Sequence, residues 1–170
     1  TMVVDNGYFR AFNDVRGTLD SIAVIVARAR LIYKLQLNVI LVVAEVRIAT
    51  DHLKESFPLN MAPEAGTCVR DPYYVIQEFN KWTRDETNGM SKSGSFHLLT
   101  NCWPSGTVGI AYVGTICKSN SNVAVTSNLN SGNTWLIFAH ELGHGFGASH
   151  TFEQGVGKTG TTMTDTLRDV

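Results

Sequence analysis

The feature that most constrains this chain is a dense histidine pattern toward its C-terminal end. The sequence holds 170 residues and five histidines, and three of these fall within residues 140–150, which read His-Glu-Leu-Gly-His-Gly-Phe-Gly-Ala-Ser-His. His140 and His144 stand four residues apart, so on a helix both imidazoles project from one face, about one turn apart. An apolar, helix-capable segment comes just before them. The pattern therefore predicts a helix whose polar face carries two side chains of the metal-ligand type.

A third histidine follows at the spacing that a single ion requires. Two imidazole nitrogens on one helix face can bind one Zn²⁺ at about 2.0–2.1 Å each. Gly147 can adopt a positive φ, so the helix can end there and the chain can turn sharply. This turn brings His150 toward the same ion. Three protein ligands leave one tetrahedral position for water, so we predict one catalytic Zn²⁺ held by His140, His144 and His150.

The residue next to the first ligand supplies a base. Glu141 points beside the ion rather than at it, so its carboxylate can accept a proton from a zinc-bound water. Zinc lowers the pKa of its bound water from 15.7 toward about 7, which makes attack on a carbonyl feasible near neutral pH. We therefore predict a hydrolase with Glu141 as the general base, and no nucleophilic serine or cysteine is needed.

Strands and helices alternate along the chain, which predicts an α/β class with a partly parallel sheet. Leu19, Ile22, Val26 and Tyr33 form one apolar face of the first expected helix. Asp71 and Pro72 are a suitable N-cap and first residue for the second. We expect helices at residues 18–34, from 71 onward, and from 133 or 134 to 142, and strands at residues 3–4, 39–48, 96–100, 107–116 and 123–126.

Composition excludes several classes of protein. The net charge is −1 and only 17% of residues are charged, which argues against a nucleic-acid partner held by a basic surface. The longest apolar run covers residues 39–44, far short of the roughly 20 that a membrane span needs. The N-terminal residues lack the pattern of a signal peptide. With no repeat or linker, the chain is expected to form one domain over residues 1–170.

The extended motif resembles that of the metzincin zinc endopeptidases, most closely the adamalysin or reprolysin branch of snake-venom and ADAM-type enzymes. Residues 96–100 are similar to the strand that precedes the active-site segment of that branch, and residues 107–117 closely resemble its upper edge strand. The resemblance implies a metzincin-type fold: a mixed, mostly parallel twisted sheet, an active-site helix and a small C-terminal part. It also implies an extracellular metalloendopeptidase, secreted or part of an ectodomain, and we expect a monomer.

The same resemblance implies how substrate is bound. Gly109, Ile110, Ala111 and Tyr112 match the edge strand that pairs with an extended polypeptide by β-augmentation. Met163 matches the methionine of a tight turn that forms an apolar floor under the ligands. Polypeptides are thus the expected partners, with no nucleic acid and no membrane insertion.

Some features depart from the family pattern. Thr151 follows the third ligand where that branch usually has Asp, and the chain ends at Val170, soon after Met163. We therefore expect a truncated C-terminal part, which leaves open the alternative of a zinc-bound but non-catalytic binding module. In the family, the cysteine matching Cys117 commonly pairs beyond the methionine turn, where this chain has none. All three pairings of Cys68, Cys102 and Cys117 stay open, as does the reduced state.

Two histidines lie outside the motif. His97, between Phe96 and Leu98, is expected to be a strand histidine with a local partner. His52, beside Asp51, is expected to be a solvated loop residue.

Overall fold

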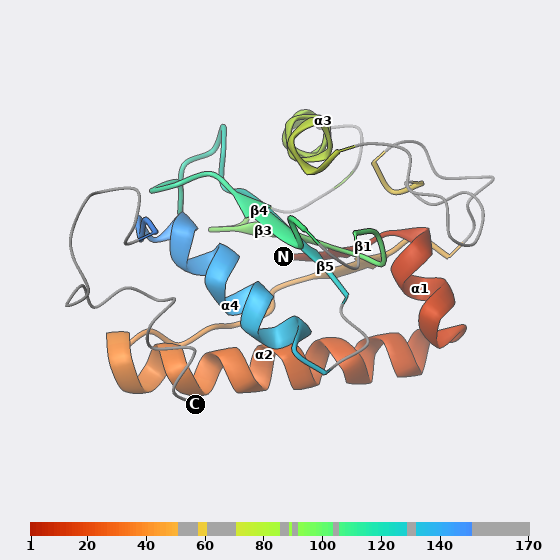
Figure 1. Ribbon diagram of the computed structural model, residues 1–170, viewed down its shortest axis with the longest axis horizontal. Helices are drawn as coiled ribbons and strands as arrows, with labels where there is room; N and C mark the ends of the chain where they lie inside the picture. Colours follow the sequence, from red (N-terminus) through yellow and green to blue (C-terminus); the bar gives the residue numbers. More distant parts are fainter. Residues whose placement is uncertain are drawn as a thin grey trace.

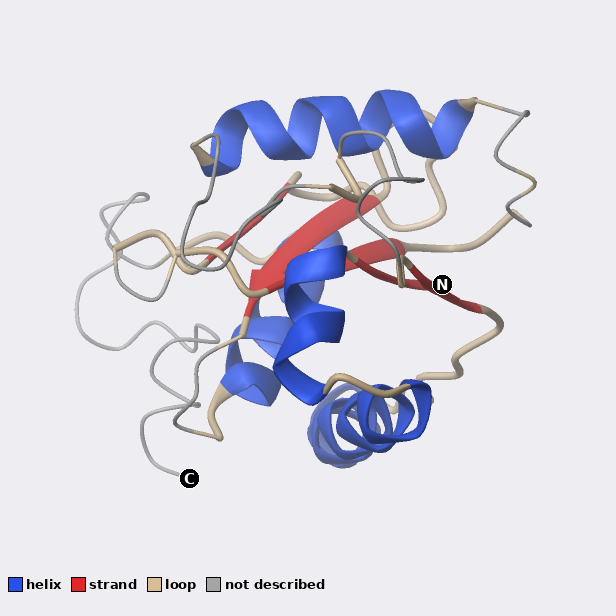
Figure 2. Cartoon of the chain, turned by 90° about the vertical axis from the view of Figure 1, so that its right-hand side faces the viewer, coloured by secondary structure: helices blue, strands red, loops and turns tan. Residues whose placement is uncertain are grey.

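The computed structural model describes residues 1–50, 58–60, 71–85, 89, 92–103, 106–128 and 132–150. A five-stranded sheet lies between α3 on one face and α2 with α4 on the other (Figures 1 and 2). The predicted mixed α/β class is confirmed. In chain order the elements are β1 (Met2–Val4), α1 (Asn6–Phe12), α2 (Val15–Leu37), β2 (Val46–Ile48), α3 (Pro72–Arg84), β3 (Phe96–Thr100), β4 (Gly109–Ala111), β5 (Val123–Ser127) and α4 (Thr134–Gly145).

The sheet has the strand order β2-β1-β3-β5-β4 and is mostly parallel. Only β4 runs antiparallel, and Ile110 faces Val125 across the β4–β5 pair. β4 forms one edge of the sheet. It is shorter than the predicted strand at residues 107–116, because the chain turns at residues 113–114 and Gly114 takes a φ of 69°. The partly parallel sheet and the edge position of this segment are confirmed.

Successive residues of the central strands point into two separate cores, as the period of two requires. Val3 and Leu98 face the core on the α3 side, whereas Val4 and Leu99 face the core on the side of α2 and α4. Helix α3 begins as predicted, with the Asp71 side chain accepting from the backbone N–H of Tyr74. The sheet is therefore covered on both faces.

Helix α2 is longer than the predicted 18–34, since the Asp14 side chain caps it by accepting from the backbone N–H of Gly17. Ile22 and Tyr33 are buried as expected, but Leu19 is 41% exposed, so its place in the buried stripe was wrong. Each helical residue is rotated by about 100° from the one before. Thr18 and Ile22, one turn apart, define the covered face at this end, and that rotation turns Leu19 toward solvent.

The predicted strand at residues 39–48 is wrong in its first part, since only Val46–Ile48 pair with a neighbour. Val46 pairs with Met2 of β1, and the Glu45 carbonyl accepts from the Met2 N–H at 2.9 Å. Val39, Leu41 and Val43 instead pack against the core on the α2 and α4 side. Ile40 is 56% exposed and Val42 is 77% exposed, so this run is covered on one face and not on both.

A short helix that the sequence patterns did not reveal follows β1. The buried Asp5 caps α1 by accepting from the backbone N–H of Tyr8 at 2.7 Å, and it also accepts from the Thr100 hydroxyl at 2.7 Å. Burial raises the pKa of Asp5 to about 7, although both hydrogen bonds act in the opposite direction. No helix in the described part of the chain is long and apolar enough to cross a membrane.

The cysteines differ in state. Cys102 is buried and disulfide-bonded, whereas Cys117 is exposed and carries a free thiol. Of the alternatives left open, both pairings that use Cys117 and the fully reduced state are therefore excluded. Cys68 lies outside the described residues.

Candidate metal centre

Helix α4 presents the predicted ligands on one face and is anchored by the other. Phe138, Ala139 and Leu142 are buried in the core on the α2 and α4 side. The Tyr33 hydroxyl of α2 donates to the Ala139 carbonyl at 2.8 Å. His140 and His144 lie on α4 as predicted. The packing of the apolar face thus fixes where both imidazoles point.

The Nε2 atoms of the three motif histidines converge. They lie 3.0 Å apart for His140 and His144, 3.0 Å for His140 and His150, and 3.2 Å for His144 and His150. Three nitrogens bound tetrahedrally to zinc at about 2.0–2.1 Å would be separated by about 3.3 Å. One nitrogen from each ring can therefore reach one metal ion. This donor set, three imidazoles within one ion's reach, fits zinc.

The turn that returns His150 to the helix is built from backbone hydrogen bonds. Gly147 takes a φ of 103°, which favours glycine, and its N–H donates to the His144 carbonyl at 2.8 Å. The N–H of Ala148 donates to the Gly143 carbonyl at 3.0 Å. The sharp turn predicted at Gly147 is therefore present.

The same turn orients one ligand. Nδ1 of His144 lies 2.7 Å from the Ala148 carbonyl oxygen, which can only accept, so Nδ1 carries the proton and donates. This leaves the lone pair of Nε2 directed at the cluster. Metal-bound histidines are commonly held in this way by a backbone carbonyl on their other nitrogen.

Electrostatics also favours a neutral His140 ring. Burial, followed by the neighbouring His144 and His150 rings, lowers the pKa of His140 to about 4. A neutral imidazole can offer a lone pair to a metal, whereas a protonated one cannot. The cluster is therefore suited to bind a cation.

Glu141 lies beside the cluster and packs against β4. Its side chain is only 5% exposed, and burial raises the pKa of its carboxyl to about 8. A Cβ atom added to Gly109 would lie 2.5 Å from Glu141 Oε1 and 2.7 Å from Ile137 Cγ2. This close approach, which only glycine allows, was not predicted, although a glycine inside a strand signals such a contact.

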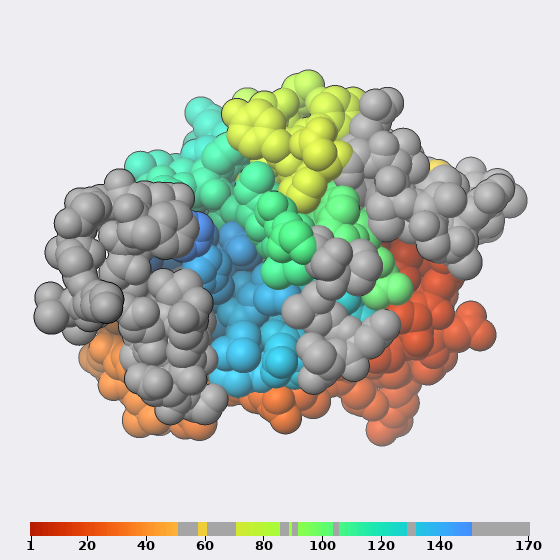
Figure 3. Space-filling model, in the orientation of Figure 1, coloured from red at the N-terminus to blue at the C-terminus, as the bar shows by residue number. Residues whose placement is uncertain are grey.

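A cleft of about 670 Å³ opens over these groups, within the range of ligand sites. Figure 3 shows the atoms of α4 (blue) between those of α2 (orange) and the β4 region (green). The cleft is bordered by Gly109, Ile110 and Ala111 of β4, opposite His140 and Glu141 of α4. Its other lining residues are Gly106, Thr107, Val108, Val113, Leu136, Ile137, His144 and His150.

The other predicted residues lie elsewhere. Tyr112 follows β4 and packs against the core on the α3 side. His97 lies in β3, and its Nε2 is 2.7 Å from the Thr126 hydroxyl, so its predicted local partner is confirmed. Met163 and His52 are outside the described residues.

The loop after β4 is tied to the end of α4, a contact that the sequence did not indicate. The N–H of Gly114 donates to the His144 carbonyl at 2.8 Å, and that of Ile116 donates to the Gly145 carbonyl at 3.0 Å. This loop therefore helps to fix the helix end that carries the second ligand.

The chain belongs to the metallopeptidase family M12: the family's reprolysin model matches residues 1–167. It is 25% identical over 170 residues to "Disintegrin and metalloproteinase domain-containing protein B" of Arthroderma otae, a match that covers 88% of this chain. The protein of that name from Trichophyton verrucosum is 26% identical over 168 residues. "Zinc metalloproteinase-disintegrin-like brevilysin H2a" of Gloydius brevicauda is 36% identical over 79 residues, which cover 45% of this chain and 19% of that protein.

These findings establish the class. The predicted membership of the reprolysin branch is confirmed, and the mostly parallel sheet with its helices is consistent with a metzincin-type fold. Family membership and the names of the relatives support a zinc metalloprotease at the level of the family. The chain spans only 21% of the length of the two fungal relatives.

Proposed function

We propose that this chain is the catalytic domain of a zinc-dependent metalloendopeptidase that hydrolyses peptide bonds of extended polypeptides. The observation that carries the proposal is the convergence of three Nε2 atoms, within 3.2 Å of one another, beside a buried carboxylate in an open cleft. His140, His144 and His150 hold the zinc. The ion, when bound, lowers the pKa of a coordinated water and polarises the scissile carbonyl.

Glu141 is the general base in this proposal. Its carboxylate accepts the proton of the attacking water and returns it to the leaving amine nitrogen. Gly109 positions it, because the missing side chain there makes room for the carboxylate against β4. Burial of Glu141 supports the role, since a carboxylate held away from bulk water is a stronger base than an exposed one.

The edge strand is the proposed substrate platform. One side of β4 pairs with β5, and the strand borders the cleft. An extended peptide can add to such an edge through backbone hydrogen bonds. Gly109, Ile110 and Ala111 offer these groups, and Tyr112 continues the segment. We further propose that Met163 forms an apolar floor under the ligands.

The proposed location is extracellular. The disulfide bond of Cys102 supports it, because structural disulfides form and persist mainly in oxidising compartments.

A cleavage assay tests the function. The zinc-loaded chain should cleave an unfolded, fluorescently labelled polypeptide, and a zinc chelator should abolish the cleavage. Glu141→Ala should remove activity while the zinc stays bound. Glu78→Ala is the matched control, because this carboxylate lies on α3, outside the cleft, and pairs with Lys81. Cleavage that survives Glu141→Ala would contradict the mechanism, and a zinc-loaded wild type without activity would favour a binding module.

A further inference from the structure

The C-terminal turn of α4 carries the second proposed ligand and leads into the turn that brings the third one back. The last carbonyl groups of a helix lack N–H partners within the helix. In α4, which ends at Gly145, these are the carbonyls of residues 142–145. The positions of His144 and His150 therefore depend on which N–H groups these carbonyls accept from.

The chain directly after α4 supplies some of these partners. Three of its backbone N–H groups donate to three of the carbonyls: Phe146 to Leu142 at 3.1 Å, Ala148 to Gly143 at 3.0 Å and Gly147 to His144 at 2.8 Å. The last two bonds form the Schellman pattern of a helix end, with glycine in its usual place. This part of the ligand turn follows from the local sequence.

The loop after β4 supplies two further donors from a distant part of the chain. The N–H of Ile116 donates to the Gly145 carbonyl at 3.0 Å, and the N–H of Gly114 donates to the His144 carbonyl at 2.8 Å. A carbonyl oxygen has two lone pairs, so it can accept both bonds that reach His144. The backbone of this ligand residue is therefore held from its own turn and from the loop.

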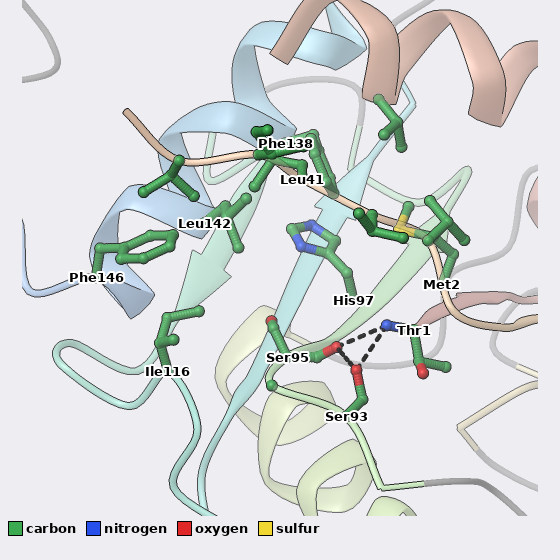
Figure 4. A pocket seen from close by; sticks show the side chains of 16 residues that line it. Thr1, Met2, Leu41, Ser93, Ser95, His97, Ile116, Phe138, Leu142 and Phe146 are labelled. Carbon is green, nitrogen blue, oxygen red and sulfur yellow. Dashed lines mark hydrogen bonds between the residues drawn. The ribbon is translucent and has the colours of Figure 1, made fainter. Parts of the chain in front are cut away.

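The loop also packs closely against this end of α4. A Cβ atom added to Gly145 would lie 3.2 Å from Ile116 Cγ1, and one added to Gly114 would lie 4.0 Å from the Cα of Gly147. Figure 4 shows the Ile116 side chain at the end of α4 that carries Phe146, and both residues line a cavity of about 210 Å³. The loop thus contacts the last helical residue and the glycine of the ligand turn.

The backbone of Gly114 has a conformation that few residues adopt. Its φ is 69°, in the left-handed region that β-branched residues avoid and asparagine tolerates. The loop is held on both sides of Gly114, because β4 pairs with β5 before it and the Cys117 N–H donates to the Gly94 carbonyl at 2.8 Å after it. A residue that cannot keep this φ must therefore displace the N–H that points at His144.

We propose that Gly114 is a positioning residue for the metal centre. Its positive φ directs its N–H at the His144 carbonyl and so holds His144, and with it the turn to His150, where both rings reach one ion. This role rests on the zinc site proposed above. Because Gly114 lies on the loop that continues β4, one segment fixes the metal ligands and also carries the proposed substrate platform.

Three variants separate this role from the general effect of a strained residue. Gly114→Val should weaken zinc binding about tenfold, the lower end of what the loss of an outer hydrogen-bond partner costs. Gly89→Val is the matched control, because Gly89 has a φ of 70° and lies outside the cleft, so it should bind zinc as the wild type does. Gly114→Asn should recover most of the affinity, since asparagine keeps the N–H and tolerates this φ. Titration against a competing chelator measures the affinity.

Two further measurements report on geometry. The visible absorption of Co²⁺ bound in place of zinc depends on coordination geometry, and it should change in Gly114→Val but not in the other two variants. Amide hydrogen exchange tests the contact in the wild type, and it decides the question if Gly114→Val does not fold. Zinc should slow exchange at Gly114 and Ile116, which donate to α4, more than at Lys118, which donates to Thr115 within the loop.

Several results would overturn the proposal. These are wild-type zinc affinity in Gly114→Val, the same loss in Gly89→Val or in Gly114→Asn, and an equal effect of zinc on exchange at the three amides. A wild type that binds no zinc would overturn this proposal together with the proposed function. Wild-type zinc affinity and cleavage in Gly114→Val would overturn the role of Gly114 alone.

Discussion

The cleft lies on one side of α4 and His97 on the other, and burial lowers the pKa of one histidine on each side. Burial lowers the pKa of His140 to about 4 and that of His97 to about 3. In the cleft, three rings direct a nitrogen at the same point, whereas behind the helix a single ring meets one hydroxyl. The number of converging lone pairs, and not burial, therefore decides which histidines suit a metal.

The helix period separates the two regions. His140 and His144 recur every fourth residue on one face, while Phe138 and Leu142 do so on another. One face of α4 can therefore present the metal ligands to the cleft, while the other face packs against the core. Substitutions in the cleft should change zinc binding or cleavage, and substitutions behind the helix should change stability.

The largest effect is expected for His144→Ala. It removes one of three ligands, so zinc affinity should fall by more than about 100-fold, beyond the 10–100-fold that loss of an outer hydrogen-bond partner costs. Cleavage should be lost with the metal. His97→Phe, behind the helix, should retain one zinc per chain. Zinc content by atomic absorption checks both variants. Equal zinc content in His144→Ala and in the wild type would contradict the claim that the cleft, and not the other side of α4, binds the metal.

Gly109→Ala should have the next largest effect. The added Cβ would lie within 2.8 Å of Glu141 Cδ, so the carboxylate must move. A displacement of about 1 Å at a catalytic group can cost about 100-fold in rate. We expect kcat to fall by that order with zinc still bound. Steady-state kinetics and zinc content measure the two quantities.

A second glycine offers the control. A Cβ at Gly94 would meet Cys117 Sγ at 3.4 Å, an ordinary contact outside the cleft. Gly94→Ala should therefore cleave substrate at the wild-type rate. Full activity in Gly109→Ala would show that the contact between β4 and Glu141 does not position the base.

Asp5→Asn should alter how stability depends on pH. The Asp5 pKa is about 7 in the folded chain against an ordinary value of 3.8, so between these values the folded state binds more protons than the unfolded state. Asp5 therefore contributes stability that is fully present below about pH 4 and is lost as the pH rises to about 7, by at most about 1.4 kcal/mol per pH unit. Urea unfolding at several pH values should show a weaker decline in Asp5→Asn. The same dependence of the free energy of unfolding on pH in both proteins would contradict the contribution assigned to Asp5.

Tyr33→Phe should have the smallest effect. It removes the hydrogen bond from the Tyr33 hydroxyl to the Ala139 carbonyl but keeps the ring in the core. The free energy of unfolding should fall by about 1 kcal/mol, the usual net value of such a bond. Cleavage should stay unchanged, and a large loss of activity would mean that the two sides of α4 are coupled.

Local patterns predicted much of this architecture because their causes are local. The cap at Asp71, the helix that carries His140 and His144, and the glycine turn at Gly147 each depend on a few neighbouring residues. The extent of pairing at residues 39–48 could not be found in this way, since it depends on where β1 lies. Contacts between segments far apart in the sequence could not be predicted either, as the close approach of Gly109 to Glu141 shows.

The most direct test of the account is X-ray absorption spectroscopy of the zinc-loaded chain, with zinc content measured on the same sample. We predict one zinc per chain, bound by three imidazole nitrogens and one water oxygen at about 2.0–2.1 Å. A sulfur ligand at about 2.3 Å, or a fourth protein ligand in place of water, would define a closed structural site and contradict the proposed mechanism.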